Sequence, residues 1–194
     1  IAQNDLFFAL KGTNFDANLF TKDALEKGAK YVVIDNKDYF IENKTILVSD
    51  TLKTLQELAN YHRRVLNTKI IALTGSNGKT TTATLTHHIL KQELEVGLSG
   101  NIGESFANQI LEKNYPNYVL EISSFQLDDI VDFKPHIAVL LNITPDHLDR
   151  YDYKFENYIN SKFRIALNQT KEDYLIYDAD DEVINEWLML NKIQ

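Results

Sequence analysis

The segment at residues 73–82, Leu-Thr-Gly-Ser-Asn-Gly-Lys-Thr-Thr-Thr, constrains the fold of this chain more than any other part of the sequence. An apolar, isoleucine-containing run precedes the loop at residues 69–74, and a stretch of helical character follows at residues 80–93. A strand, a glycine-containing turn and a helix in this order are the usual setting of a phosphate-binding loop. The segment therefore predicts a βα unit whose connecting loop holds an anion.

Each residue type in this loop has a chemical use. Gly75 and Gly78 let the backbone turn tightly, so that amides and the positive end of the next helix face an anion. Lys79 reaches the β- and γ-phosphates of a nucleotide, and the Thr80 hydroxyl is a ligand for Mg²⁺. The expected nucleotide-binding residues are Gly75, Ser76, Asn77, Gly78, Lys79, Thr80 and Thr81.

The loop is shorter than the usual G-x-x-x-x-G-K-[ST] pattern, because Leu73 stands where the first glycine is expected. The alternative interpretation is a plain glycine turn before a helix with an exposed lysine. The strand–loop–helix context favours the phosphate loop over this alternative.

Apolar runs alternate with helical stretches along the whole chain. This pattern predicts an α/β protein, with a small amino-terminal α/β domain at residues 1–66 and a doubly wound, mostly parallel sheet flanked by helices at residues 67–194. The candidate boundary is Asn67-Thr68. Strands are expected at residues 31–34, 45–48, 69–74, 96–98, 118–122, 137–143 and 174–177. Helices are expected at residues 20–27, 51–66, 80–93, 102–112, 124–131 and 155–167, with a further helix at the end.

The composition argues against several classes of protein. A net charge of −8 argues against a general nucleic-acid binder, and no apolar run approaches the ~18 residues of a membrane span. The chain has no cysteine, which rules out disulfides and thiolate zinc sites and fits a reducing compartment, so we expect a cytoplasmic protein. The chain starts at Ile1 without a methionine and stops within a helical stretch, so we expect a fragment.

Two further groups with metal-binding chemistry follow predicted strands. Glu121 ends one strand, and Asp146-His147 follow another, so both are expected at the carboxyl edge of the sheet, where ligands bind. Glu121 can hold the Mg²⁺ that Thr80 also holds; the alternative is a charge placed at the start of the next helix. His147 can ligate a metal as a neutral imidazole that Asp146 orients; the alternative is a solvated turn.

Lys162 falls on the apolar side of its predicted helix. Phe155, Tyr158, Ile159, Phe163 and Ala166 form the apolar stripe, and Lys162 lies on the same face, seven residues after Phe155. A lysine in this place must snorkel to solvent, find a partner or lose its proton, and periodicity alone favours snorkelling. Because Lys162 lies on the apolar stripe, we expect desolvation to lower its pKa.

Several motifs together resemble the Mur ligase family, and the loop Thr-Gly-Ser-Asn-Gly-Lys-Thr-Thr also resembles that of folylpolyglutamate synthetase. Residues 100–103 (Gly-Asn-Ile-Gly), 121–127 (Glu-Ile-Ser-Ser-Phe-Gln-Leu) and 142–151 (Asn-Ile-Thr-Pro-Asp-His-Leu-Asp-Arg-Tyr) resemble its D-glutamate-adding branch, over about residues 69–184. The resemblance implies that Lys162 is carbamylated and holds a second Mg²⁺ with His147. It also implies catalytic roles for Lys79, Lys162 and His147, and substrate contacts for Asn101 and Ser123.

The amino-terminal part resembles a different branch of the family. Residues 4–16, Asn-Asp-Leu-Phe-Phe-Ala-Leu-Lys-Gly-Thr-Asn-Phe-Asp, and the continuation to residues 61–64 resemble the D-alanyl-D-alanine-adding branch, whose first domain holds the UDP end of the substrate. Because the two resemblances meet near the phosphate loop, we expect a natural or engineered chimera joined between about Ile70 and Thr86. A single divergent ligase is the alternative. We expect both domains to be incomplete and the family's carboxy-terminal domain to be absent.

The resemblance implies an ATP-dependent ligase of peptidoglycan precursor synthesis. ATP would phosphorylate a carboxylate of a UDP-N-acetylmuramoyl substrate, and an amino acid or dipeptide would attack the acyl phosphate to form an amide. The expected partners are these small molecules, the expected cofactors are ATP and Mg²⁺, and the chain is expected to be a monomer. One alternative is a truncated or chimeric nucleotide-binding module without ligase activity. Another is an unrelated kinase or GTPase, against which the short loop and the Asp146, His147 and Lys162 set argue.

Overall fold

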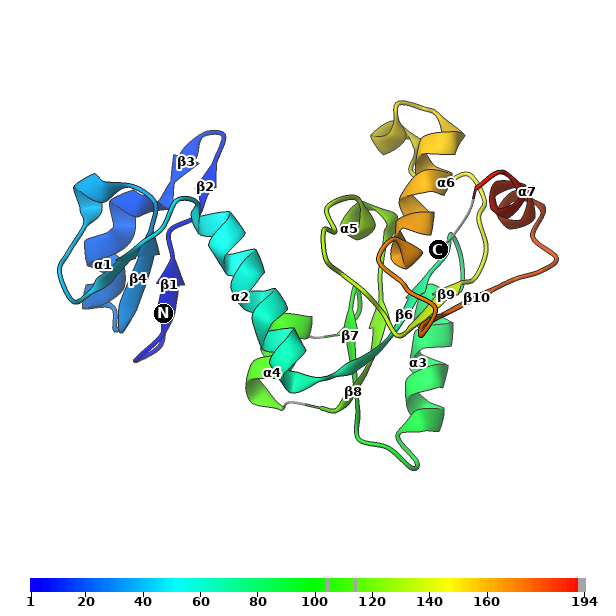
Figure 1. Ribbon diagram of the computed structural model, residues 1–194, viewed down its shortest axis with the longest axis horizontal. Coiled ribbons are helices and arrows are strands. Elements are labelled where there is room, and N and C mark those ends of the chain that lie inside the picture. The colour runs from blue at the N-terminus through cyan, green and yellow to red at the C-terminus, as the bar shows by residue number, and fades with distance from the viewer. Residues whose placement is uncertain (104, 114, 192–194) are drawn as a thin grey trace. The chain divides into compact units, whose positions relative to one another are not determined.

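The computed structural model describes residues 1–103, 105–113 and 115–191, apart from the side chains of residues 59, 60, 62–64, 66, 108, 111 and 112. The chain divides into two compact units, Ile1–Val65 and Leu66–Gln194. The junction is adjacent to the boundary predicted between residues 66 and 67. Figure 1 labels the elements of each unit. In the described part of the chain, no helix is both long and apolar enough to cross a membrane.

The first unit contains a parallel sheet of three short strands in the order β1-β4-β5. These strands are Leu6–Phe8, Tyr31–Ile34 and Thr45–Leu47, and the antiparallel pair β2 (Lys11–Gly12) and β3 (Phe15–Asp16) forms a small hairpin. Helix α1 spans Thr21–Glu26 after a 3-10 turn at Ala17–Phe20, and helix α2 spans Thr51–Leu66. Val32 and Ile34 of β4 pack against small side chains, namely Ala9, Ala17, Ala24 and Ala29.

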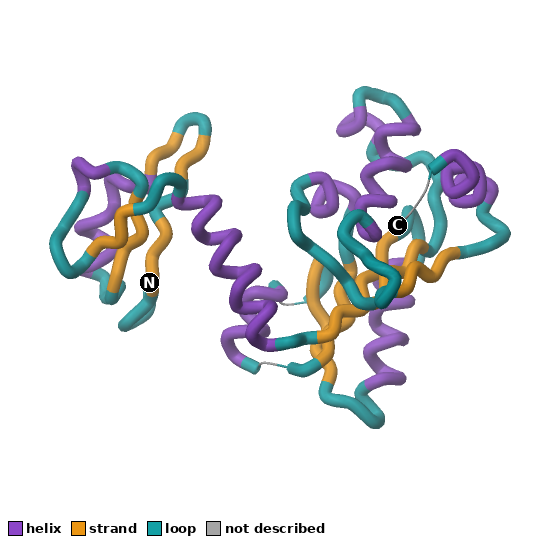
Figure 2. The backbone as a smooth tube through the Cα atoms, viewed as in Figure 1, coloured by secondary structure: helices purple, strands orange, loops and turns teal. Residues whose placement is uncertain are grey.

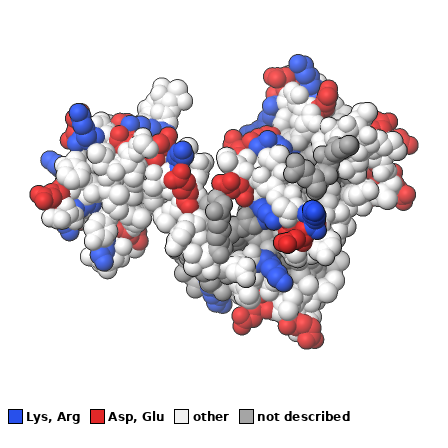
Figure 3. All heavy atoms as spheres, in the orientation of Figure 1, with Lys and Arg blue, Asp and Glu red and all other residues white. Residues whose placement is uncertain are grey.

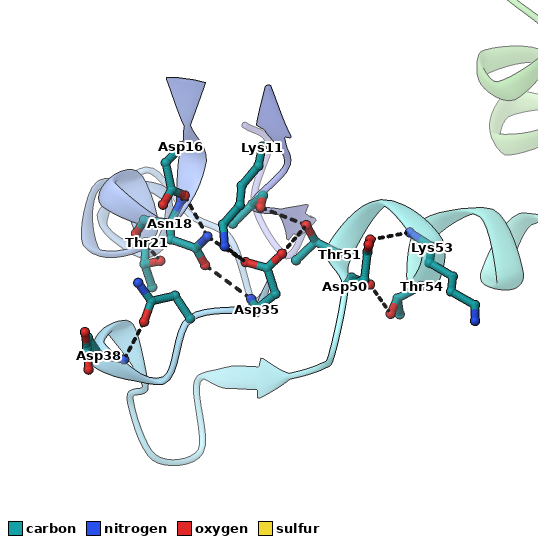
Figure 4. A network of polar contacts seen from close by, with 12 residues as sticks. Lys11, Asp16, Asn18, Thr21, Asp35, Asp38, Asp50, Thr51, Lys53 and Thr54 are labelled. Carbon is teal, nitrogen blue, oxygen red and sulfur yellow. Dashed lines mark hydrogen bonds and ion pairs between the residues drawn. The ribbon is translucent and has the colours of Figure 1, made fainter. Parts of the chain in front are cut away.

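A polar network joins the hairpin, β4 and the start of α2 in this unit (Figure 4). Asn18 is fully buried, and its side-chain amide donates to Asp16 at 2.7 Å and to Asp35 at 2.9 Å. The Lys11 amine lies 2.7 Å from the same Asp35 carboxylate. Burial opposes ionisation of Asp35, but the bonds from Lys11 and Asn18 outweigh it and lower the pKa of that carboxyl.

The second unit contains a five-stranded parallel sheet in the order β10-β9-β6-β8-β7 (Figure 2). The strands are β6 (Lys69–Thr74), β7 (Val96–Gly100), β8 (Asn117–Glu121), β9 (Ile137–Leu140) and β10 (Tyr174–Tyr177). The helices are α3 (Lys79–Leu90), α4 (Phe106–Glu112), α5 (Ser124–Asp128), α6 (Phe155–Phe163) and α7 (Glu182–Leu190).

Helices cover both faces of this sheet, as Figure 1 shows for α3 on one side and α5 and α6 on the other. Leu73 and Val119 face α3, where Ala83 packs on them. The alternate positions, such as Ala72 and Leu120, face the opposite layer with Leu127, Ile165 and Ala166. The parallel, doubly wound sheet is therefore confirmed, and all its strands end at the same edge.

Several elements are shorter than the sequence predicts. The strand expected at residues 137–143 ends at Leu140, and two residues later Asn142 bonds to the phosphate loop: its backbone oxygen accepts from the Ser76 amide at 3.0 Å. The helix expected at 124–131 ends at Asp128, and the one expected at 155–167 becomes a 3-10 turn from Arg164. The helix expected at 102–112 begins only at Phe106, and Glu104 of that range lies outside the described residues.

On the face drawn in Figure 3, acidic and basic side chains are interspersed over the surface of each unit.

Candidate nucleotide-binding site

The phosphate loop lies between β6 and α3, as the sequence predicts. Gly78 has a φ of 77°, in the left-handed region, and α3 begins at the next residue, Lys79. A side chain at Gly75 would not fit, because its Cβ would lie 2.9 Å from Leu141 Cβ. Both glycines are therefore required by the backbone path, and the helix directs its amino-terminal amides toward the loop.

The Lys79 side chain folds back over this loop. Its amine donates to Gly75 O at 2.9 Å and to Ser76 O at 3.1 Å. The Lys79 amine therefore lies against the backbone of the loop, and the residue is only half-buried. An exposed lysine beyond a plain turn, the alternative interpretation, would not make these contacts.

Thr80 and Glu121 lie together at the carboxyl edge of the sheet. The Thr80 hydroxyl donates to Glu121 Oε2 at 2.8 Å, and the Asn101 side-chain amide donates to Oε1 at 3.2 Å. The Glu121 side chain is buried with the residue 2% exposed. A carboxylate that only favoured the start of α5 would have no reason to turn toward Thr80 on α3, so the geometry supports the metal-binding interpretation.

Gly100 and Asn101 hold the backbone at Glu121. The Asn101 amide donates to Glu121 O at 2.8 Å, and a Cβ on Gly100 would lie 2.1 Å from that same oxygen. Ser123 behaves differently, because it caps α5: its hydroxyl donates to Gln126 Oε1 at 2.8 Å. The predicted substrate contact of Ser123 stays a prediction, and its hydroxyl proton is used within the helix cap.

The loop after β9 is bound to the phosphate loop. The Ser76 amide donates to Asn142 O at 3.0 Å, and the Asn77 amide donates to Asn142 Oδ1 at 2.8 Å. The Ser76 hydroxyl donates to Thr144 O at 2.8 Å and accepts from the Thr144 amide at 2.9 Å. These bonds hold residues 142–144 beside the phosphate loop.

His147 is the strained residue of this second loop. Its φ is 49°, and its exposed ring lies 3.5 Å from the Asp146 carboxylate, measured from Nε2 to Oδ2. Residues other than glycine that have a positive φ occur more often at functional sites. Asp152 and Tyr153, a few residues later, also have a positive φ. Among the described residues, no group of three or more His, Cys, Asp or Glu side chains converges for a metal.

Lys162 is buried, and the snorkelling interpretation is wrong. The residue is 1% exposed, and its amine donates to Gly75 O at 2.8 Å, the same carbonyl that accepts from Lys79. Burial and the nearby charge of Lys79 lower the pKa of Lys162 from 10.5 to about 7, with an opposing effect of Asp146. The lowered pKa that desolvation predicts is therefore confirmed.

Sequence reasoning missed two side chains at this site. In the sequence, Asn142 is one residue of a longer motif, and Tyr158 is one position of the apolar stripe of its helix. The Tyr158 hydroxyl lies 3.1 Å from Ser76 Oγ. The available signal was an aromatic residue with a polar tip one helical turn before Lys162.

The sequence model of one protein family, described as the Mur ligase middle domain, matches residues 73–193. By sequence, the chain is 61% identical over 126 residues to the UDP-N-acetylmuramoylalanine–D-glutamate ligase of Christiangramia forsetii, covering 64% of this chain and 28% of that protein. It is 55% identical over 144 residues to the ligase of the same name from Cytophaga hutchinsonii, covering 73% of this chain and 32% of that protein. The chain thus spans about a third or less of the length of these relatives.

Solved structures match nearly the whole chain. MurF ligase from Thermotoga maritima in complex with ADP has a TM-score of 0.78 at 26% identity, covering 98% of this chain and 46% of that one. MurF from Acinetobacter baumannii has a TM-score of 0.77 at 25% identity, with 96% and 43% covered. The sequence relatives and the structural neighbours thus carry different names, and the expected chimera stays a prediction. Since the family model covers more than half of the sequence, the chain belongs to the Mur ligase family.

Proposed function

We propose that this chain is part of an ATP-dependent ligase that joins an amino acid or dipeptide to a UDP-N-acetylmuramoyl substrate in peptidoglycan synthesis. The observation that carries the proposal is the phosphate loop with Lys79 at its mouth and the Thr80–Glu121 pair beside it. Family membership, relatives named as D-glutamate ligases and a structural neighbour holding ADP support the same conclusion. Membership also removes the unrelated kinase or GTPase alternative.

In the proposed reaction the loop binds the ATP phosphates. The backbone amides at the start of α3 and the Lys79 amine stabilise negative charge on the γ-phosphoryl group as it moves to the substrate carboxylate. For this, Lys79 must exchange its bonds to Gly75 O and Ser76 O for bonds to phosphate oxygens. An amine then attacks the acyl phosphate, and an amide and inorganic phosphate form.

Thr80 and Glu121 suit one Mg²⁺. A hydroxyl and a carboxylate 2.8 Å apart are hard oxygen donors, and Asn101 orients the carboxylate through its second oxygen. When bound, the ion neutralises phosphate charge and orients the γ-phosphoryl group. We also assign Asn101 a contact with the substrate or the transferred phosphoryl group, as the resemblance to the family implies.

Lys162 suits carbamylation. Its pKa of about 7 leaves much of the amine neutral at neutral pH, and a neutral amine can attack the carbon of CO₂ and release one proton. The product replaces a buried cation by an anion with two oxygens, which is a ligand type that Mg²⁺ prefers. We assign a second Mg²⁺ to this carbamate and His147, with Asp146 orienting the ring.

The other parts of the proposal follow from the family. The first unit holds the UDP end of the substrate, the chain works as a monomer on small molecules, and its location is the cytoplasm. A nucleotide-binding module without ligase activity is a second candidate, favoured by the small share of its relatives' length that the chain covers. Product analysis separates the two, because amide formation requires a ligase and ATP hydrolysis does not.

Calorimetric titration with a non-hydrolysable ATP analogue and Mg²⁺ tests whether the phosphate loop and Lys79 bind a nucleotide. The Lys79→Ala change removes a charge-assisted contact of about 1.5–3 kcal/mol, so the affinity should fall more than about tenfold. Lys91→Ala, at the exposed carboxyl end of α3, is the matched control and should bind like the parent chain. Equal affinity of the Lys79→Ala chain and the parent contradicts the assignment.

A further inference from the structure

Tyr158 lies between the phosphate loop and Lys162, and the proposed mechanism gives it no role. The residue is 1% exposed on α6. Its hydroxyl contacts Ser76 of the loop, and its ring lies beneath the Lys162 amine, 4.5 Å from Nζ to the ring centroid. A single side chain thus contacts both a residue of the phosphate loop and Lys162.

The bonding around Ser76 decides which hydroxyl donates. Ser76 has one hydroxyl proton, and Thr144 O accepts it at 2.8 Å, while Thr144 N donates to the same oxygen at 2.9 Å. The remaining contact at 3.1 Å is then a bond that Tyr158 donates to Ser76 Oγ. In this arrangement every group around the Ser76 hydroxyl is satisfied, so removal of the Tyr158 hydroxyl leaves Ser76 with one partner fewer.

The ring of Tyr158 has a separate contact. Lys162 follows one helical turn later, so the two side chains lie on the same face of α6. The Lys162 amine rests over the ring and donates to Gly75 O, the residue next to Ser76. The hydroxyl and the ring of Tyr158 therefore act on adjacent residues of the loop, one directly and one through Lys162.

We propose that Tyr158 is a positioning residue: its hydroxyl fixes Ser76 and its ring seats the Lys162 amine, which together set the distance between the phosphate loop and that amine. The role in the reaction rests on the proposed function. The alternative is core packing alone, since the ring also meets Tyr151 with centroids 5.3 Å apart and Phe155 with centroids 6.3 Å apart. The two possibilities differ in what each half of the side chain does.

Two measurements without nucleotide test the positioning itself. In Tyr158→Phe, amide hydrogen exchange at residues 75–77 should accelerate about five- to tenfold, as expected for one lost hydrogen bond, while the acetylation rate of Lys162 stays within about twofold. In Tyr158→Leu, both rates should rise. Tyr151→Phe and Tyr151→Leu are the matched controls, because the Tyr151 hydroxyl donates to Asp128 rather than to the loop.

Titration with the ATP analogue and Mg²⁺ then connects positioning to function. Tyr158→Phe should weaken binding about five- to tenfold, and Tyr151→Phe should leave it unchanged. Equal exchange rates in Tyr158→Phe and Tyr151→Phe, or equal acetylation of Lys162 in the two leucine variants, would overturn the positioning role. If the parent chain binds no nucleotide while the exchange and acetylation results hold, the proposed function fails and the positioning contact stands.

Discussion

The polar network of the first unit and the phosphate loop of the second unit both collect charged groups at one end of a parallel sheet, but they balance charge differently. In the first unit, Lys11 pairs with Asp35 at 2.7 Å, and Asn18 bonds to both nearby carboxylates. In the second unit, Lys79 and Lys162 both donate to one neutral oxygen, Gly75 O. Within the described residues, neither of these two lysines has an ion-pair partner.

This difference separates a structural network from a binding site. A network that neutralises itself has little to gain from an added anion, so its contribution is to hold the hairpin, β4 and α2 together. Two amines on one carbonyl repel each other, and that repulsion is part of the cause of the lowered pKa of Lys162. An anionic ligand or a carbamate relieves this repulsion. The repulsion between the two amines therefore lowers the stability of the second unit until such a group is present.

The change Gly100→Ala should break the second unit and leave the first intact. The new Cβ would lie 2.1 Å from Glu121 O, and the φ of 108° already disfavours a side chain, so we expect a loss of about 3 kcal/mol or more. Limited proteolysis should then degrade the part after residues 67–68 while residues 1–65 persist. Gly12→Ala is the control, since its Cβ meets nothing within 4 Å. Loss of both units together would mean that they do not fold separately.

The change Asn18→Ala should destabilise the first unit and leave the second unit intact. Asp16 and Asp35 lose a shared donor in a buried place, and the Asp35 amide loses its acceptor, for a cost of about 2–3 kcal/mol. Hydrogen exchange of the β4 amides should accelerate, while exchange in β6 stays unchanged. Asn14→Ala, at the exposed tip of the hairpin, should alter neither strand. Unchanged exchange in β4 would show that the network does not stabilise the unit.

The smallest expected effect, taken per pH unit, is a pH dependence that Lys162 gives to the second unit. Lys162 has a folded pKa of about 7 against 10.5, so between these values the unfolded chain binds one proton more than the folded chain. Stability therefore rises with pH in this window, by up to about 1.4 kcal/mol per pH unit, and the slope fades as the pH falls through 7. Urea unfolding followed by fluorescence of Trp187, the one tryptophan, measures it from pH 7 to 9.5.

Lys162→Met removes the titrating amine, so its stability should lack this slope and should exceed that of the parent at pH 7. Lys11→Met provides the comparison in the first unit: it should lower stability, because Asp35 loses its ion pair. A parent chain whose pH slope equals that of Lys162→Met would show that the buried amine keeps its ordinary pKa.

Much of the fold followed from local sequence patterns. The strand at Lys69–Thr74 and the helix at Thr51–Leu66 have the predicted bounds, because an apolar run and an amphipathic period each report one element directly. The strand predicted at residues 137–143 is three residues shorter in the structure, where it ends at Leu140. The apolar side chains of Leu141 and Ile143 extend the apolar run in the sequence and so favour a longer strand. The backbone of Asn142 and Ile143 bonds instead to Ser76 and Asp181, which no local pattern reveals.

The candidate site divides in the same way. By itself the sequence determined the loop between β6 and α3, because the glycines, the lysine and the threonine from which anion binding is predicted are neighbours in the chain. It also placed Glu121 and His147 after strands, and parallel strands bring such residues to one edge. Only the tertiary structure decided the state of Lys162, whose partner Gly75 O is 87 residues away. Helical periodicity gives the face on which a side chain lies, but its pKa depends on what the fold places opposite that face.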